Sequence, residues 1–208
     1  MKDHPIARVL VAAANGQFPD PDGSVEVVPP WRPGVEGVLS MTGRAYIATT
    51  RSVDSVLAHE PDGYGRAVDP RFIVWLAGPD GWCDCLDAVL VAVGTGVGGP
   101  PLRPDLADHP RANHARLVRD EVTVYGDNRG LVTLGRGIGG LAELGIELRS
   151  GTERGAGRSL IRNSLGLIER GEPVVASVAP GNARALRAFL AAGFTPVGSV
   201  QLVRPVGR

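Results

Sequence analysis

Three short segments with the period-two alternation of β-strands follow one another in the second half of the chain. They cover residues 118–125, 131–135 and 141–148, and glycine-containing stretches at 126–130 and 137–140 separate them. Connections this short join antiparallel neighbours, because a parallel pair needs a crossover of a dozen or more residues. The sequence therefore predicts an antiparallel meander of three strands.

Helix and strand patterns alternate after the meander. Apolar residues recur at helical spacing after a glycine-rich turn, and a nearly continuous apolar run follows a Gly and Pro stop signal. The expected elements are a helix of about four turns after residues 155–157, with its apolar stripe from Leu160 to Ile168, a strand over 173–179, a helix capped by Asn182 and ended by Gly193, and a last strand over about 195–203.

The N-terminal half carries weaker signals. It predicts strands over 25–28, 38–48 and 87–93 and helices over 52–59 and 69–76. The Gly-, Pro- and Asp-rich connection 94–111 is the expected boundary. We therefore predict an α/β protein with a mixed, mostly antiparallel sheet flanked by helices, in which 1–111 form an N-terminal α/β arm or degenerate half-domain and 112–208 the core.

Residues 94–99 formally satisfy the G-x-G-x-x-G pattern of dinucleotide-binding folds after a strand. That fingerprint needs a helix to open from the glycines. Prolines at 100, 101 and 104 forbid such a helix, so we interpret this segment as a loop.

The charges of the chain balance, with 22 Lys+Arg and 22 Asp+Glu. Composition therefore gives no reason to expect a nucleic-acid or membrane-surface partner. No stretch approaches the ~20 apolar residues that span a bilayer, so we expect a cytoplasmic protein.

Cys83 and Cys85 are the only cysteines. The sequence around them lacks the further thiols or imidazoles that a zinc site needs, so we interpret them as reduced thiols.

Residues 151–158 (GTERGAGR) lie between a predicted strand and a predicted helix. Their glycines let the backbone approach a pyrophosphate closely, and N–H groups at the start of a helix favour an anion. Arg154 and Arg158 add positive charge beside those groups. The pattern predicts an anion-binding turn.

Together with a second pattern downstream, this turn resembles the GNAT superfamily of acyl-CoA N-acyltransferases. The first signature of that family, Q/R-x-x-G-x-G/A, corresponds to T-x-x-G-x-G from Thr152 to Gly157. The second, N-x-x-A-x-x-x-Y-x-x-x-G-F, corresponds to the segment from Asn182 to Phe194, with Phe189 in place of the tyrosine. The resemblance covers about the last hundred residues.

The resemblance implies a GNAT-like fold and transfer of an acetyl or other acyl group from coenzyme A to a primary amine of a small molecule or peptide. Acetyl-CoA would be the co-substrate, no metal would be needed, and a homodimer is left open. The residues expected to bind the coenzyme are Leu148, Arg154, Gly155, Ala156, Gly157, Arg158, Asn182 and Phe189.

Two carboxylates on the preceding strand are candidates for the base that the family uses to deprotonate its amine. Glu143 and Glu147 share one face of that strand. Glu143 is the first choice and Glu147 the second; the alternative is that both are exposed carboxylates balancing Arg136 and Arg149. The family also uses a backbone N–H near the strand end to hold the thioester carbonyl, here that of Glu147 or Leu148.

Two departures from the family pattern support a competing hypothesis. Thr152 replaces Gln or Arg, and Phe189 cannot protonate a departing thiolate. The competing hypothesis is a degenerate domain that binds acyl-CoA, or a protein partner, without catalysis. A third is an unrelated structural module with no affinity for the coenzyme.

The N-terminal half holds all three tryptophans and an acidic string at Asp54, Glu60 and Asp62. Such a surface would suit a cationic amine. Core packing is the preferred explanation for most of the aromatic rings.

Overall fold

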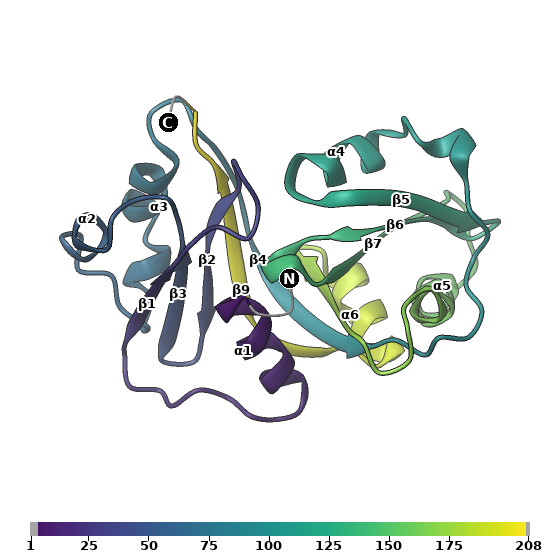
Figure 1. The fold of residues 1–208 in the computed structure, drawn as a ribbon. Coiled ribbons are helices and arrows are strands. Elements are labelled where there is room, and N and C mark those ends of the chain that lie inside the picture. The colour runs from purple at the N-terminus through teal and green to yellow at the C-terminus, as the bar shows by residue number, and fades with distance from the viewer. Residues whose placement is uncertain (1–3, 207–208) are drawn as a thin grey trace. The chain divides into compact units, whose positions relative to one another are not determined.

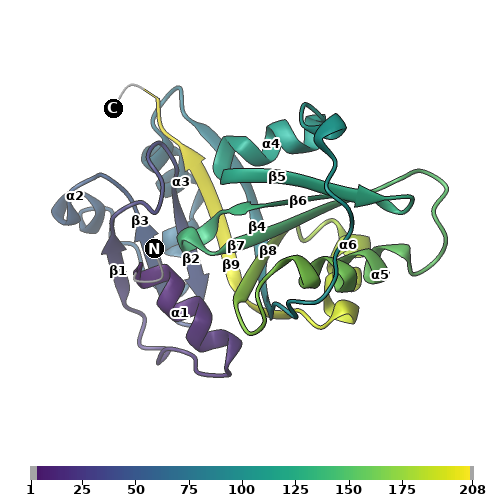
Figure 2. The same cartoon turned by 45° about the vertical axis from the view of Figure 1, so that its right-hand side comes forward.

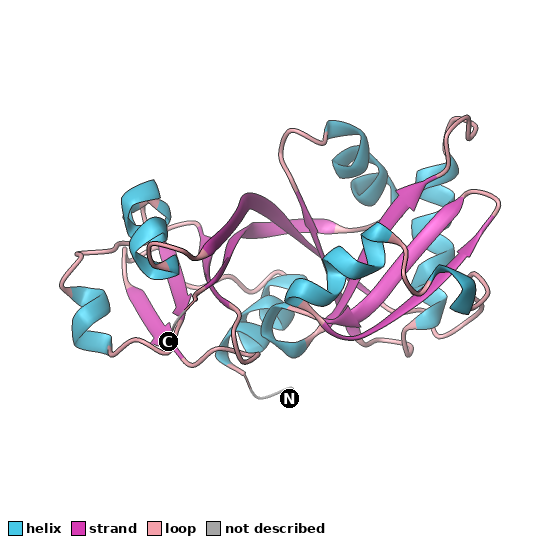
Figure 3. Ribbon diagram, turned by 90° about the horizontal axis from the view of Figure 1, so that it is seen from above, coloured by secondary structure: helices cyan, strands magenta, loops and turns pink. Residues whose placement is uncertain are grey.

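The structure is a computed structural model, and it describes residues 4–206. Within this range it has a mixed α/β fold with six α-helices and nine strands in a mostly antiparallel sheet (Figures 1 and 3). The strands follow the order β1-β3-β2-β9-β4-β8-β7-β6-β5. The chain forms two compact units, here called unit 1 (Val89–Pro196) and unit 2 (4–88 and 197–206).

The predicted meander forms the outer part of the sheet in unit 1. Strands β5 (Asp120–Asp127), β6 (Gly130–Arg136) and β7 (Ala142–Leu148) pair antiparallel. β6 matches β7 along its whole length, from Gly130↔Leu148 to Arg136↔Ala142. The sequence prediction is confirmed for these three strands.

The elements after the meander also form where the sequence predicts them. Gly157 lets α5 lie close to β7 and α6, since a Cβ there would be 3.3 Å from Cδ1 of Leu148 and 3.4 Å from Cβ of Ala188. Helix α5 ends at Ser164 and continues as a 3-10 turn, one turn earlier than expected, where Gly166 abuts the backbone of residues 97–98. The elements are α5 (Ala156–Ser164), β8 (Pro173–Val178), α6 (Ala183–Ala192) and β9 (Thr195–Arg204).

Helix α4 (Pro110–Val118) was not predicted. Its amino end has an imidazole cap, because Nδ1 of His109 accepts the N–H of Arg111 at 3.2 Å. Only its small residues and Val118 are buried, and Ala112 packs on the sheet, so the apolar stripe was too weak to show in the sequence. Figures 1 and 2 show α4 on one face of β5–β7 and α5 and α6 on the other.

Unit 2 has its own core, in which strands β2, β3 and β9 pack with helices α2 (Val53–Leu57) and α3 (Pro70–Ala77). The segment predicted as one strand over 38–48 is a hairpin of β2 (Glu36–Met41) and β3 (Arg44–Ala48), since Gly43 turns the chain at φ +68°. The short strand β1 (Val25–Val28) pairs parallel with β3. Helix α1 (Pro5–Ala14) was not predicted.

The aromatic residues of unit 2 are mostly packed. Tyr46 is buried, and Trp75 lies against the core with the His59 ring at 3.9 Å and the Arg51 guanidinium at 4.1 Å from its ring centre. Tyr64 is exposed and donates its hydroxyl to the carbonyl of Pro21. The contacts of Tyr46 and Trp75 are those expected of core packing, whereas Tyr64 lies at the surface.

The two units divide inside strands rather than at a linker. The division falls within β4 (Trp82–Val93) and again within β9. The expected boundary near residue 111 lies inside unit 1. Residues 94–99, the dinucleotide-like pattern, form a loop, as predicted.

Asn182 caps α6, because its Oδ1 accepts the N–H of Ala185 at 3.1 Å. We expect Asn182→Ala to lower the free energy of unfolding by about 1 kcal/mol, measured by urea denaturation. Asn182→Asp is the matched control, since aspartate keeps the cap and suits the positive end of the helix. Equal losses in both variants would show that the cap does not stabilise α6.

Candidate functional site

Strands β7 and β8 pair only at their starts. The parallel register contains Ala142↔Val174 and Glu143↔Val175 and goes no further. From Leu144 onward, the edge of β7 on the β8 side has no strand beside it. An extended ligand can therefore add to this edge as a strand would.

The direction of the β7 amides follows from one hydrogen bond. The N–H of Arg149 donates to the carbonyl of Arg129 at 3.0 Å, on the β6 side. Successive N–H groups of a strand point to opposite sides, so the N–H groups of Leu148 and Ile146 point away from β6. They face the edge from which β8 has diverged.

The amino end of α5 lies directly after this edge. Gly155 occupies the cap position in the left-handed region at φ +91°, and no side chain caps the first turn. Gly151, in the preceding loop 149–155, has φ +77°. Both glycines are exposed, with nothing within 4 Å of where a Cβ would be. The helix start is thus open to a ligand, and its N–H donors favour an anion.

These features border a cavity of about 1300 Å³ in unit 1. Its walls are the end of β7, loop 149–155, the first turn of α5 and one side of α6 as far as Ala191. Helix α4 contributes Arg111 on the face of β7 that carries Glu147, so the cavity is lined from both faces of the strand. It exceeds the roughly 300–1,000 Å³ of ordinary ligand pockets.

The cavity is strongly cationic in a chain whose formal charge is zero. Its only acidic lining residues are Glu147 and Glu153. Charges of one sign gathered in a cleft attract a ligand of the opposite sign. The arginines that line the cavity are Arg111, Arg149, Arg154, Arg158, Arg184 and Arg187.

Most residues predicted to bind the coenzyme line this one cavity. They are Leu148, Arg154, Gly155, Gly157, Arg158 and Asn182, joined by the candidate base Glu147. Ala156 is in the first turn of α5 but is not among the lining residues. Phe189 is only 3% exposed and packs edge-on against Phe194, with ring centres 5.0 Å apart, so it does not line the cavity.

Glu143 lies elsewhere, although it shares a strand face with Glu147. It is 1% exposed, and its Oε1 lies 2.5 Å from Nη2 of Arg119. The hydroxyl of Ser177 on β8 donates to the same oxygen at 3.0 Å, and the N–H of Ile138 donates to Oε2 at 3.1 Å. This carboxylate is fully engaged in a buried polar cluster, whereas Glu147 is exposed in the cavity.

Four of the cavity arginines were not predicted from the sequence as binding residues, namely Arg111, Arg149, Arg184 and Arg187. Arg184 and Arg187 follow the cap Asn182 at a spacing that puts them on one face of α6, and this signal was available. Arg111 could not be found, because its helix was not predicted.

The cysteine pair shows no sign of activation. Cys83 and Cys85 are free and exposed. Desolvation, and then a hydrogen bond to Asp87, raises the pKa of the Cys85 thiol to about 12.

Among residues 4–206 no group of three or more His, Cys, Asp or Glu side chains could hold a metal ion. No helix in that range combines the length and apolar character needed to cross a membrane.

No model of a known protein family matches the chain, and no curated protein matches its sequence. The function is therefore inferred from the residues of the site.

The different surroundings of the two glutamates predict different costs of substitution. Glu143→Ala leaves Arg119 buried without its partner and should lower the free energy of unfolding by about 3–5 kcal/mol. Glu147→Ala removes an exposed carboxylate and should cost no more than about 0.5 kcal/mol. Urea denaturation of both variants checks this, and a small loss in Glu143→Ala would contradict the assigned ion pair.

Proposed function

We propose that unit 1 is an acyl-CoA-dependent N-acyltransferase, as the resemblance to the GNAT superfamily predicts. The observation that carries the proposal is the six-arginine cavity that joins the open edge of β7 to the uncapped start of α5. Coenzyme A combines a pyrophosphate and a further phosphate with an extended amide-containing arm. The cavity offers cations and helix N–H groups for the phosphates and a strand edge for the arm.

The two parts of the ligand would occupy different walls. The pyrophosphate would lie at the N–H groups of the first turn of α5, beside Arg154 and Arg158. The amide arm would run along β7 and exchange hydrogen bonds with its backbone. Of the two N–H groups expected to hold the thioester carbonyl, those of Glu147 and Leu148, only that of Leu148 faces the open edge. Because Leu148 lies between Ile146 and the start of α5, its N–H would bond to the arm, and the N–H of Ile146, which faces the same edge, would hold the thioester carbonyl at the far end of the arm. An amide aimed at the developing oxyanion lowers the barrier by several kcal/mol.

Glu147 would act as the base. It is the carboxylate of β7 that lines the cavity, and Glu143 is committed to Arg119. The amine nitrogen attacks the thioester carbonyl carbon, the C–N bond forms, and the amine loses a proton to Glu147 directly or through water. The C–S bond then breaks. Phe189 has no proton to give, so the thiolate would leave unassisted or take a proton from water.

A second candidate is a domain that binds acyl-CoA without transferring the acyl group. Phe189 favours this candidate, because its buried side chain cannot donate a proton and the family commonly places a proton donor at that position. Release of free thiol on mixing with acetyl-CoA and a panel of primary amines separates the two candidates. Tight binding with no thiol release above the uncatalysed rate would identify the non-catalytic domain.

The binding step is tested by calorimetric titration with acetyl-CoA. We expect micromolar affinity, and a loss of at least about 100-fold, equivalent to about 2.7 kcal/mol, in the double variant Arg154→Glu/Arg158→Glu. Arg170→Glu is the matched control, since Arg170 is exposed and does not line the cavity. Unchanged affinity in the double variant, or no binding by the wild type, would overturn the assignment.

The catalytic step is tested by Glu147→Gln. Loss of a general base should lower kcat by about 10²–10⁴ and leave the KM for acetyl-CoA nearly unchanged, because the amide keeps the shape of the side chain. Glu169→Gln, on an exposed residue outside the cavity, should retain wild-type kinetics. A wild-type kcat in Glu147→Gln would remove Glu147 from the mechanism.

A further inference from the structure

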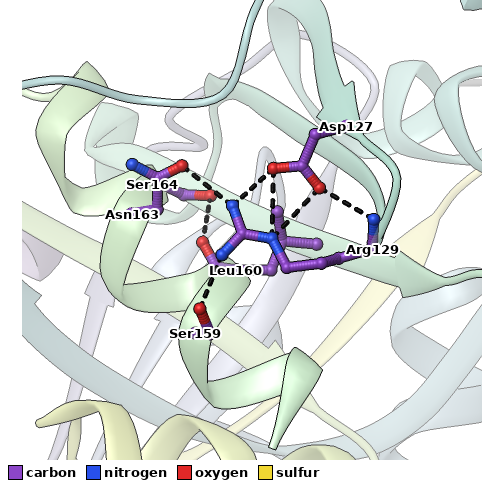
Figure 4. A network of polar contacts seen from close by, with 6 residues as sticks. All are labelled: Asp127, Arg129, Ser159, Leu160, Asn163 and Ser164. Carbon is purple, nitrogen blue, oxygen red and sulfur yellow. Dashed lines mark hydrogen bonds and ion pairs between the residues drawn. The ribbon is translucent and has the colours of Figure 1, made fainter. Parts of the chain in front are cut away.

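The turn between β5 and β6 carries a rigid Asp–Arg pair outside the cavity (Figure 4). Nε of Arg129 donates to both carboxylate oxygens of Asp127 at 3.1 Å, Nη2 also contacts that carboxylate, and the N–H of Arg129 donates to Oδ1 at 2.9 Å. The Arg129 guanidinium holds the pKa of the Asp127 carboxyl below its usual range. The pair is therefore charged at neutral pH, and the fork geometry fixes the guanidinium in one orientation.

The same guanidinium also forms hydrogen bonds with two residues of α5. Its Nη1 donates to Oγ of Ser159 at 2.6 Å, and its Nη2 donates to Oδ1 of Asn163 at 3.0 Å. These two residues lie one helical turn apart on the same face of α5. Figure 4 shows the side chain of Arg129 reaching across from the turn to this face.

The backbone of Arg129 holds a second element. Its carbonyl accepts the N–H of Arg149, the first residue of loop 149–155. Arg129 thus binds the start of loop 149–155 through its main chain and helix α5, which follows the loop, through its side chain.

The loop itself has few bonds of its own. The N–H of Thr152 reaches the carbonyl of Arg149 at 3.4 Å, and the N–H of Ala156 reaches that of Glu153 at 3.2 Å. Gly151 and Gly155 add no packing, because both are exposed. The conformation of the loop therefore depends strongly on how its two ends are held.

We propose that Arg129 is a positioning residue for the anion-binding loop: it sets the separation between Arg149 and the start of α5, and so the arrangement of the N–H groups that receive the phosphates. This inference rests on the proposed function for the identity of the ligand. Arg129 itself does not line the cavity.

The test compares Arg129→Ala with Arg103→Ala. Arg103 forms a similar fork with Asp105 two residues away, at 2.8 and 2.6 Å, but none of its hydrogen bonds reaches α5. We expect Arg129→Ala to weaken coenzyme A binding by about 10- to 100-fold, the effect of a small displacement of a binding group. It should leave kcat/KM for acetyl-pantetheine, which lacks the pyrophosphate, within about twofold of wild type, whereas a general loss of structure would lower both.

Hydrogen exchange of the free protein gives a readout that needs no ligand. Amides of residues 150–157 should exchange faster in Arg129→Ala, and in the milder double variant Ser159→Ala/Asn163→Ala, than in wild type or Arg103→Ala. Unchanged exchange and unchanged coenzyme A affinity in Arg129→Ala would overturn the inference. Faster exchange in a protein whose wild type binds no coenzyme A would instead confirm the positioning of the loop and contradict the proposed function.

Discussion

The site depends on the point at which β7 and β8 stop pairing. At the last paired position, Glu143↔Val175, the Glu143 carboxylate is bonded to Ser177 on β8 and to Arg119. Removing one partner from such a buried cluster is costly, and the cluster links β7 to β8 at the point where the strands meet. Beyond it, the backbone of β7 presents polar groups to an open edge. Buried or covered backbone groups need partners, and a ligand that lies along the edge supplies them.

The charged residues around this edge favour an anionic ligand. The chain has no net charge, yet six arginines line one cavity with only two glutamates. The uncapped start of α5 lies among them, so fixed charges and the helix dipole act in the same direction. A polyanion is favoured there over a neutral ligand, and its attraction should weaken as salt concentration rises. The Asp127–Arg129 pair lies outside the cavity, and Arg129 holds both ends of loop 149–155, which carries two of these arginines.

Sequence patterns predicted the elements whose signals are local. The meander, α5 and α6 have alternation, helical spacing, a cap at Asn182 and a glycine stop at Gly193. Helix α4 was missed because its buried face consists mainly of alanines, and the β2–β3 hairpin because its turn is short. Alternation placed Glu143 and Glu147 on one face but could not tell which half of the strand is covered. Glu143 is buried and Glu147 exposed because β8 and Arg119, which are distant in sequence, cover only the first half of β7.

The central claim is that coenzyme A lies along the open edge of β7 with its pyrophosphate at the start of α5. Amide chemical shifts of the isotope-labelled protein, recorded during a titration with coenzyme A, test it most directly. We predict that the largest changes occur at Leu148, Gly155, Gly157 and Arg158, with little change in residues 25–77. Shifts confined to other parts of the chain, or no shifts at millimolar coenzyme A, would contradict the claim.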